Sequence, residues 1–418
     1  MAMPDLLDQL GVPAHLRSFE ATHKAAWQRL GGISPAAYAR SRNCLDGSVT
    51  GLSPYFTHGL VSMADAARAV NKRHALSFDD KLVFEFGWRE FFQHVWAHQK
   101  NPDAILQDMH GVLPWHGKYA EILPQDIRRG STGVPAIDNA VRILYATGYL
   151  HNHMRMWLAS YVVHIRKVSW RAGADWLYGH LLDGDLPSNH LSWQWVAGTF
   201  SSKPYLFNAE NVLKYAPLDA KQAWNSSRTA IDQSYEALEV IARQRPAMGA
   251  ELGKHPAIDE PALLTAFYSS NRPIAQFNKA FTASEKIANK NVQLIHPWSL
   301  SERQPTESGT SSFRLGVIHL PAHQAWPWSE RRWQFVLDAM AAVTDDVWIG
   351  DISQLDLRSA ASVSAQACLF PAYRDALRHL AVLSPQPRLL PDPTMACRSF
   401  SKFYERARRD VSQLSDLL

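Results

Sequence analysis

The stretch Gly148–Trp195, GYLHNHMRMWLASYVVHIRKVSWRAGADWLYGHLLDGDLPSNHLSWQW, decides the fold of this chain. From Leu150 to Val168 the apolar side chains recur at intervals of three and four residues, which predicts a helix. On that helix Asn152, Arg155 and Met156 share one face, because residues three or four apart are neighbours. This face therefore combines a neutral amide, a fixed cation and a soft apolar tip.

A turn with paired carboxylates follows this helical pattern. Asp183, Gly184 and Asp185 come shortly before Pro187 and Asn189, and the glycine and proline end the helix. A polar cluster surrounded by so many aromatic residues indicates a lined pocket rather than a solvated face. A calcium-binding turn is the competing interpretation. No further oxygen ligands follow at EF-hand spacing, so we expect no metal.

Composition limits the class of protein. A chain of 418 residues with 46% hydrophobic and 20% charged residues is long enough for two or three soluble domains. The net charge of +4 permits nucleic-acid binding but does not argue for it. The three cysteines are scattered, without metal or disulfide spacing, which favours a reducing compartment. Because neither a signal peptide nor a membrane span is predicted, we expect a cytoplasmic protein without membrane contact.

Two stretches nearer the N-terminus also carry polar groups. Ser48–Phe56, SVTGLSPYF, places small hydroxyl residues and a glycine ahead of a helix, which suits either a phosphate cradle or an ordinary Ser/Thr N-cap. Phe84–Trp96 predicts a helix with an aromatic face. Glu85 and Arg89 lie four residues apart on it, and from the residues alone a surface ion pair is the favoured interpretation.

The C-terminal part changes character. Val292–His296, Phe313–Leu320 and Asp346–Asp351 have the composition of strands, and Ser329 can cap a helix over Glu330–Val343. Alternating strands and helices predict a small, mostly parallel α/β sheet.

The motifs between Tyr38 and Tyr215 resemble, in kind and order, the flavin-binding domain of the DNA photolyase and cryptochrome family. The resemblance implies a mainly α fold with an all-helical FAD-binding domain over residues 1–217. From the residue pattern we expect a helical connector over 218–290 and a small Rossmann-like α/β domain over 291–418. This last domain is faintly similar to the family's antenna domain. In the family that domain precedes the flavin domain, so here its order would be permuted, and the sequence does not identify an antenna pigment.

The resemblance also implies the site residues. Non-covalent FAD would be held by Tyr38, Thr50, Gly51, Leu52, Ser53, Arg89, Arg155, Asp183, Gly184, Asp185 and Asn189. The damaged bases would meet Glu85, Trp88, Asn152, Met156 and Trp195. Trp193, Trp170 and Trp115 match a chain of tryptophans that carries an electron from the surface to the flavin, although Trp115 aligns only across a two-residue insertion. On the residues alone, each tryptophan is expected simply to pack.

Three residues on the face that would meet the damaged bases, Asn152, His153 and Met156, distinguish repair enzymes from photoreceptors within that family. Asn152 and Met156 match photolyases that act on cyclobutane pyrimidine dimers, which implies a light-dependent deoxyribodipyrimidine photolyase-like lyase acting on single- or double-stranded UV-damaged DNA. His153 stands where an arginine helps to hold DNA phosphate, and a neutral imidazole lacks that charge. His153 and the unusual C-terminal domain favour the alternative, a cryptochrome-like blue-light photoreceptor that signals through a protein partner.

Overall fold

The computed structural model describes residues 3–99, 106–244, 256–266, 283–303 and 311–418. Contacts divide the chain into two compact units. The helical unit comprises residues 1–18, 34–51 and 98–262, and the sheet unit comprises residues 19–33, 52–97 and 263–418. The predicted domain boundaries stay predictions. Residues 245–255 and 267–282 of the predicted connector lie outside the described residues.

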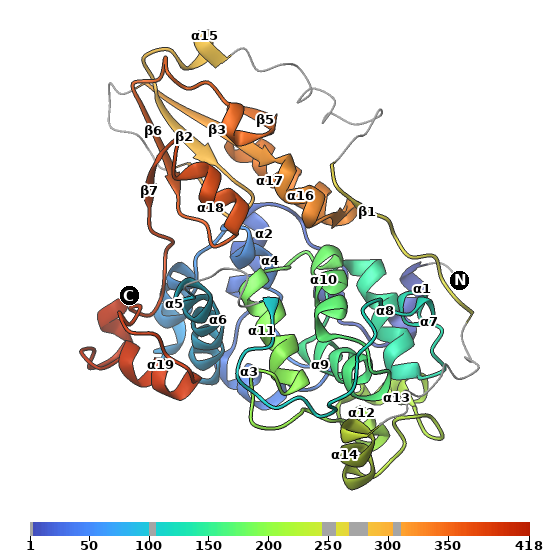
Figure 1. Ribbon diagram of the computed structural model, residues 1–418. Coiled ribbons are helices and arrows are strands. Elements are labelled where there is room, and N and C mark those ends of the chain that lie inside the picture. The colour runs from blue at the N-terminus through green and yellow to red at the C-terminus, as the bar shows by residue number, and fades with distance from the viewer. Residues whose placement is uncertain (1–2, 100–105, 245–255, 267–282, 304–310) are drawn as a thin grey trace. The chain divides into compact units, whose positions relative to one another are not determined.

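The helical unit consists of short and medium helices (Figure 1). They are α1 (Met3–Gln9), η1 (Ala14–Leu16), α3 (Pro35–Ser41), α7 (Gln125–Arg128), α8 (Pro135–Thr147), α9 (Asn152–Ser160), the π-helix η3 (Tyr161–Ile165), α10 (Trp170–His180), α11 (Leu186–Ala197), α12 (Ala209–Tyr215), η4 (Leu218–Ala220), α13 (Lys221–Trp224) and α14 (Tyr235–Arg243).

The helix predicted from Leu150 is confirmed, with one change. It runs as α9 and then loosens into the π-helix η3 before the chain turns at Lys167, which has a φ of 54°. Single π turns inside helices are frequent at functional sites. The next two helices begin at side-chain caps, because Ser169 accepts from the backbone N–H of Arg171 and Asp185 accepts from that of Ser188.

The sheet unit holds the remaining elements. They are α2 (His23–Gly31), α4 (Ser53–Thr57), α5 (Met63–His74), α6 (Lys81–Ala97), β1 (Leu263–Leu264), α15 (Ala283–Ile287), β2 (Asn291–Ile295), β3 (Ser312–His319), α16 (Leu320–Ala325), β4 (Trp328–Ser329), α17 (Glu330–Val343), β5 (Asp346–Gly350), η6 (Ile352–Gln354), β6 (Ser362–Gln366), α18 (Pro371–Leu377), β7 (Val382–Ser384), α19 (Phe400–Ala407) and η7 (Leu414–Leu417).

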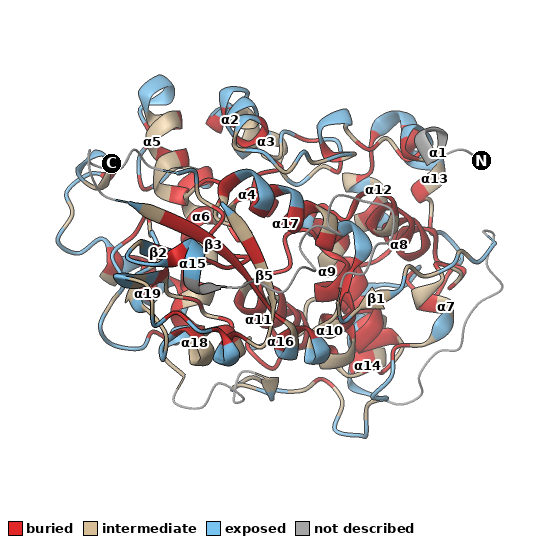
Figure 2. Cartoon of the chain, turned by 90° about the horizontal axis from the view of Figure 1, so that it is seen from above, coloured by how far each residue is buried: buried red, intermediate tan, exposed pale blue. Residues whose placement is uncertain are grey.

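Five strands form a parallel sheet in the order β5-β3-β2-β6-β7, which confirms the predicted parallel α/β arrangement. In chain order the strands stand third, second, first, fourth and fifth, as in doubly wound folds. β3 is buried over nearly all its length (Figure 2), as expected when helices cover both faces of a parallel sheet. Among the described residues, no helix is long and apolar enough to cross a membrane.

Beyond β7, the segment 388–408 (the C-terminal segment) is bonded to helix α6. Glu90 on α6 is 0% exposed, and its two carboxylate oxygens accept from the backbone N–H groups of Leu389 (2.6 Å) and Leu390 (2.8 Å). Arg388 donates to the backbone carbonyl of Glu90 at 3.1 Å. Burial raises the pKa of Glu90 to about 7, although Arg388 and both N–H groups act in the opposite direction.

This buried carboxyl group predicts a pH-dependent stability. Because the folded-state pKa lies above its ordinary value of 4.5, the stabilisation is fully present below about pH 4.5 and is lost as pH rises through about 7. The shift corresponds to roughly 3 kcal/mol in the free energy of unfolding. Denaturant unfolding at pH 5 and pH 8 measures it, with the non-titrating Glu90→Gln variant as the reference. An identical pH dependence in the two proteins would contradict the assignment.

Candidate functional site

An ion pair between Arg155 and the buried Asp183 joins helix α9 to the turn before α11 in the helical unit. Arg155 on α9 donates from Nη2 to Oδ2 of Asp183 at 2.7 Å and from Nε to the carbonyl of Leu150 at 2.9 Å. The Asp183 side chain is 2% exposed and that of Arg155 is 25% exposed. Burial alone would lower the pKa of Arg155, but the Asp183 carboxylate outweighs burial and raises it. The pair therefore offers a permanently charged, immobilised cation.

Helix α11 carries the two other polar residues of the predicted turn. Asp185 caps it, and Asn189 donates from Nδ2 to the carbonyl of Ala174 on α10 at 2.8 Å. That bond fixes the amide and leaves Oδ1 as the remaining acceptor, since no described residue donates to it. Gly184 lies in the turn between the two aspartates. The predicted FAD contacts Arg155, Asp183, Gly184, Asp185 and Asn189 are thus brought together in one unit.

The predicted lesion contacts of the helical unit lie on α9 and α11. Asn152 directs its Nδ2 at the sulfur of Met156, 3.9 Å away, one turn further along α9. Asn152 is exposed and Met156 half-buried, so this predicted polar and apolar pair does face outward. Trp195 is 37% exposed, and its ring lies 5.8 Å from that of Tyr205.

The loop predicted to hold a phosphate leads into the short helix α4. Gly51 adopts a φ of 61°, a left-handed conformation that favours glycine. The N-cap residue of α4 is Leu52, which makes no side-chain cap hydrogen bond. The alternative interpretation of this loop as an ordinary Ser/Thr N-cap is therefore wrong. Thr50 and Ser53, on either side, are half-buried. Tyr38 lies on α3 and donates its backbone N–H to Ser34.

Helix α6 carries the predicted site residues of the sheet unit. Glu85, Trp88 and Arg89 are all half-buried. Arg89 donates from Nη2 to the hydroxyl of Thr57 at 3.0 Å. The Trp88 ring stacks on that of Phe400. Whether these residues share one pocket with those of the helical unit stays a prediction.

Two of the predicted relay tryptophans lie on neighbouring helices, Trp170 on α10 and Trp193 on α11. Trp193 is 2% exposed and lies one helical turn beyond Asn189 on α11. A Cβ at Gly173 on α10 would lie only 2.3 Å from two ring carbons of Trp193, so the glycine creates the space for that ring. Trp170, one turn before Gly173, is 5% exposed. Its indole N–H donates to the carboxylate of Asp108 at 2.7 Å, which favours positive charge on the ring.

Trp115 occupies a different setting, on a loop. Its ring is half-buried, 5.0 Å from the ring of Tyr119, with the Nζ of Lys167 lying 5.8 Å from its centroid. Burial lowers the pKa of Lys167 to about 8. The ring contacts of Trp170 and Trp115 within the described chain are with His190 and Tyr119, not with each other. The predicted relay of Trp193, Trp170 and Trp115 therefore stays a prediction.

His153 is neutral at pH 7. It is 8% exposed, its ring centroid lies 4.4 Å from that of Tyr215, and burial lowers its pKa to about 4, with the charge of Arg42 acting in the same direction. The expected loss of a phosphate-binding charge at this position therefore agrees with its surroundings.

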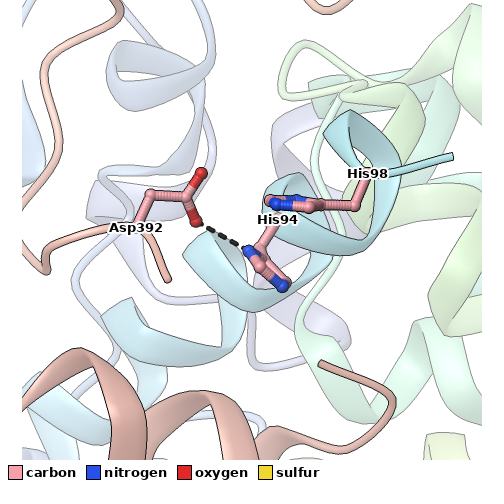
Figure 3. A group of neighbouring side chains, drawn as sticks. All are labelled: His94, His98 and Asp392. Carbon is pink, nitrogen blue, oxygen red and sulfur yellow. Dashed lines mark hydrogen bonds and ion pairs between the residues drawn. The ribbon is translucent and has the colours of Figure 1, made fainter. Parts of the chain in front are cut away.

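A group of potential metal ligands lies at the end of α6 (Figure 3). One ligand atom each of His94, His98 and Asp392 lies within 4.8 Å of the others. However, Nε2 of His94 accepts from the backbone N–H of Cys397 at 2.9 Å, so its proton resides on Nδ1 and is donated to Asp392 at 2.7 Å. Both ring nitrogens of His94 thus serve to attach the C-terminal segment to α6.

Three residues that contact the predicted site tryptophans were not predicted from the sequence: Phe400, Gly173 and Asp108. Phe400 lies in the C-terminal sequence SFSKFYE, which has no feature that predicts contact with Trp88. Gly173 lies within a helix, where an isolated glycine signals a packing reason without naming the partner. Asp108 lies in a loop without motif.

Comparisons with known proteins bear on this site. Residues 82–231 match the family model for the FAD binding domain of DNA photolyase. The chain is 33% identical over 190 residues to a deoxyribodipyrimidine photo-lyase of Synechococcus, covering 43% of this chain and 39% of that protein. A protein of the same name from Thermus thermophilus is 34% identical over 194 residues, covering 45% of this chain and 44% of that protein.

The cryptochrome structure of Synechocystis sp. PCC6803 shares 24% identity over 55% of this chain and 53% of that one, with a TM-score of 0.44. The matched part of the chain spans roughly two fifths of the length of the Synechococcus and Thermus thermophilus photo-lyases. The matched family region includes the predicted site residues from Glu85 to Trp195 but excludes Tyr38 and the loop at residues 50–53.

Proposed function

We propose that this protein binds FAD non-covalently and repairs cyclobutane pyrimidine dimers in UV-damaged DNA, because residues 82–231 match the family model for the FAD binding domain of DNA photolyase. The observation that carries the proposal is the polar set of the helical unit, which consists of the ion pair between Arg155 and the buried Asp183 and of Asn189, whose amide is held by Ala174. The chemistry that reduced FAD supplies under blue light is reversible donation of one electron to the dimer.

The donor set fits a flavin ring. Arg155 is fixed by two hydrogen bonds and provides a positive charge that favours an anionic reduced ring. Asn189, with its amide nitrogen occupied by Ala174, offers an oxygen that can accept a hydrogen bond from a proton-bearing ring nitrogen. Asp183 acts through Arg155 by holding its guanidinium in place.

The exposure and the chemistry of four side chains support the proposed contacts with the damaged bases. Asn152 can donate to carbonyl oxygens of a pyrimidine, and Met156 supplies a polarizable apolar surface beside it. Trp88 is half-buried and Trp195 is 37% exposed, so a base could stack on either indole. Extrusion of the damaged bases is favoured because a lesion is already poorly stacked. Trp193, Trp170 and Trp115 would serve photoreduction, with exposure increasing in that order.

A second candidate function, a blue-light photoreceptor, is favoured by His153. The neutral, 8% exposed imidazole provides no charge for a DNA phosphate. A receptor would retain FAD and the tryptophans and would signal through a protein partner. We also propose that the parallel sheet of residues 291–418 corresponds to the family's antenna domain in permuted order, which its doubly wound strand order supports.

One assay distinguishes DNA repair from photoreception. Purified protein with chemically reduced flavin is illuminated with UV-damaged oligo(dT), and the absorbance is followed near 260 nm, roughly where intact bases absorb. Repair predicts a light-dependent recovery of absorbance that is missing in the dark. No recovery, although the flavin spectrum shows a bound and reduced cofactor, would favour the photoreceptor.

A further inference from the structure

The C-terminal helix α19 covers one face of Trp88. The rings of Phe400 and Trp88 are 4.2 Å apart between centroids and tilted by only 7°, which is face-to-face stacking. The other two ring neighbours of Trp88 in the described chain, Phe91 and Phe92, are inclined at 79° and 46°. Phe400 is 6% exposed, whereas Trp88 retains exposed surface. One face of the indole is therefore occupied by a residue more than 300 positions away in the chain.

Phe400 itself is firmly held. Its ring contacts those of Phe84 (4.6 Å) and Tyr404 (5.2 Å), and the hydroxyl of Tyr404 donates to the backbone carbonyl of Phe78 at 2.7 Å. Phe403, on the same helix, is 0% exposed. The buried carboxylate of Glu90 and the ring of His94 bind the preceding part of the C-terminal segment by four hydrogen bonds. The stack on Trp88 thus rests on a fixed support.

We propose that Phe400 is a positioning residue of the lesion site, which holds the Trp88 indole so that its exposed surface stacks on a flipped-out pyrimidine. This inference rests on the proposed function. An indole supported on one face loses less side-chain freedom when a base binds, so support increases affinity without adding a contact to DNA. The C-terminal segment would then be a component of the substrate site, although it follows the α/β sheet in the chain.

The test measures binding of an oligonucleotide with one thymine dimer and of its undamaged counterpart to the full chain. In Phe400→Leu, which keeps apolar volume but removes the flat ring, affinity for the damaged strand should fall about three- to tenfold, as expected for the loss of an aromatic pair. Affinity for the undamaged strand, flavin content and repair rate at saturating lesion should stay unchanged. Phe400→Tyr, which retains the flat ring, should restore lesion affinity.

Phe403→Leu is the matched control, because Phe403 is also buried on α19 but contacts Phe91 and His94 instead of Trp88. If Phe403→Leu weakened lesion binding as much as Phe400→Leu, the effect would reflect general loosening and the inference would be overturned. Unchanged lesion binding in Phe400→Leu would also overturn the inference. Tighter lesion binding would overturn it too, because it would show that the Phe400 ring blocks Trp88 and must move away before a base binds. A wild-type chain without preference for damaged DNA would instead overturn the proposed function, and the inference with it.

Discussion

Replacing Arg155 by glutamine is expected to destabilise the protein by about 3–5 kcal/mol and to abolish flavin retention. The physical reason is the environment of Asp183, whose side chain is 2% exposed and receives the Arg155 guanidinium at 2.7 Å. Without the cation, a buried carboxylate loses its compensating charge while its desolvation cost remains. Denaturant unfolding of the apoprotein measures the change in the free energy of unfolding. Flavin absorbance after gel filtration measures how much flavin the protein retains.

Arg243→Gln is the control for this experiment. Arg243 pairs with Glu239 one turn away on α14, with side chains 49% and 55% exposed. Exposed pairs of this kind contribute only about 0.3–0.5 kcal/mol, so the control should keep both stability and flavin. Equal effects of the two substitutions would mean that burial does not distinguish the Arg155–Asp183 pair, which contradicts its assigned role.

The second large effect is expected for Trp193→Phe. A phenyl ring is harder to oxidise than an indole, so photoreduction should slow by roughly tenfold or more, equivalent to at least about 1.4 kcal/mol in the barrier. Repair with chemically reduced flavin should continue, because the relay would act only in reduction. Flash photolysis measures the first quantity and dimer splitting the second. Loss of both to the same degree would show that the substitution disturbs the helical unit as a whole and would contradict a specific role of Trp193 in photoreduction.

A subtler substitution tests the geometry of the same ring. In Gly173→Ala the new methyl group would lie 2.3 Å from the Trp193 ring, so the ring must move. Photoreduction should slow although every tryptophan is retained. Gly31→Ala is the matched control, since a Cβ there meets nothing within 4 Å. Photoreduction in Gly173→Ala as fast as in Gly31→Ala would show that the position of Trp193 is not critical.

The sequence by itself determined the features that depend on neighbours along the chain. Helical periodicity located α6 and α9, the capping residue Ser329 marked the start of α17, and the carboxylates around Gly184 marked the turn before α11. Three strands were found because each is a short apolar run. β6 and β7 were missed, since they lie toward one edge of the sheet, are partly exposed and lack such a run.

The tertiary structure alone decided which distant residues meet. The stack of Phe400 on Trp88, the bonds from Glu90 to Leu389 and Leu390, and the space that Gly173 leaves for Trp193 join residues 20 to 312 positions apart. Periodicity and capping report the local backbone and the face of an element that is buried. They do not specify the partner of that face, because burial of apolar surface is non-directional and many partners would satisfy it equally well.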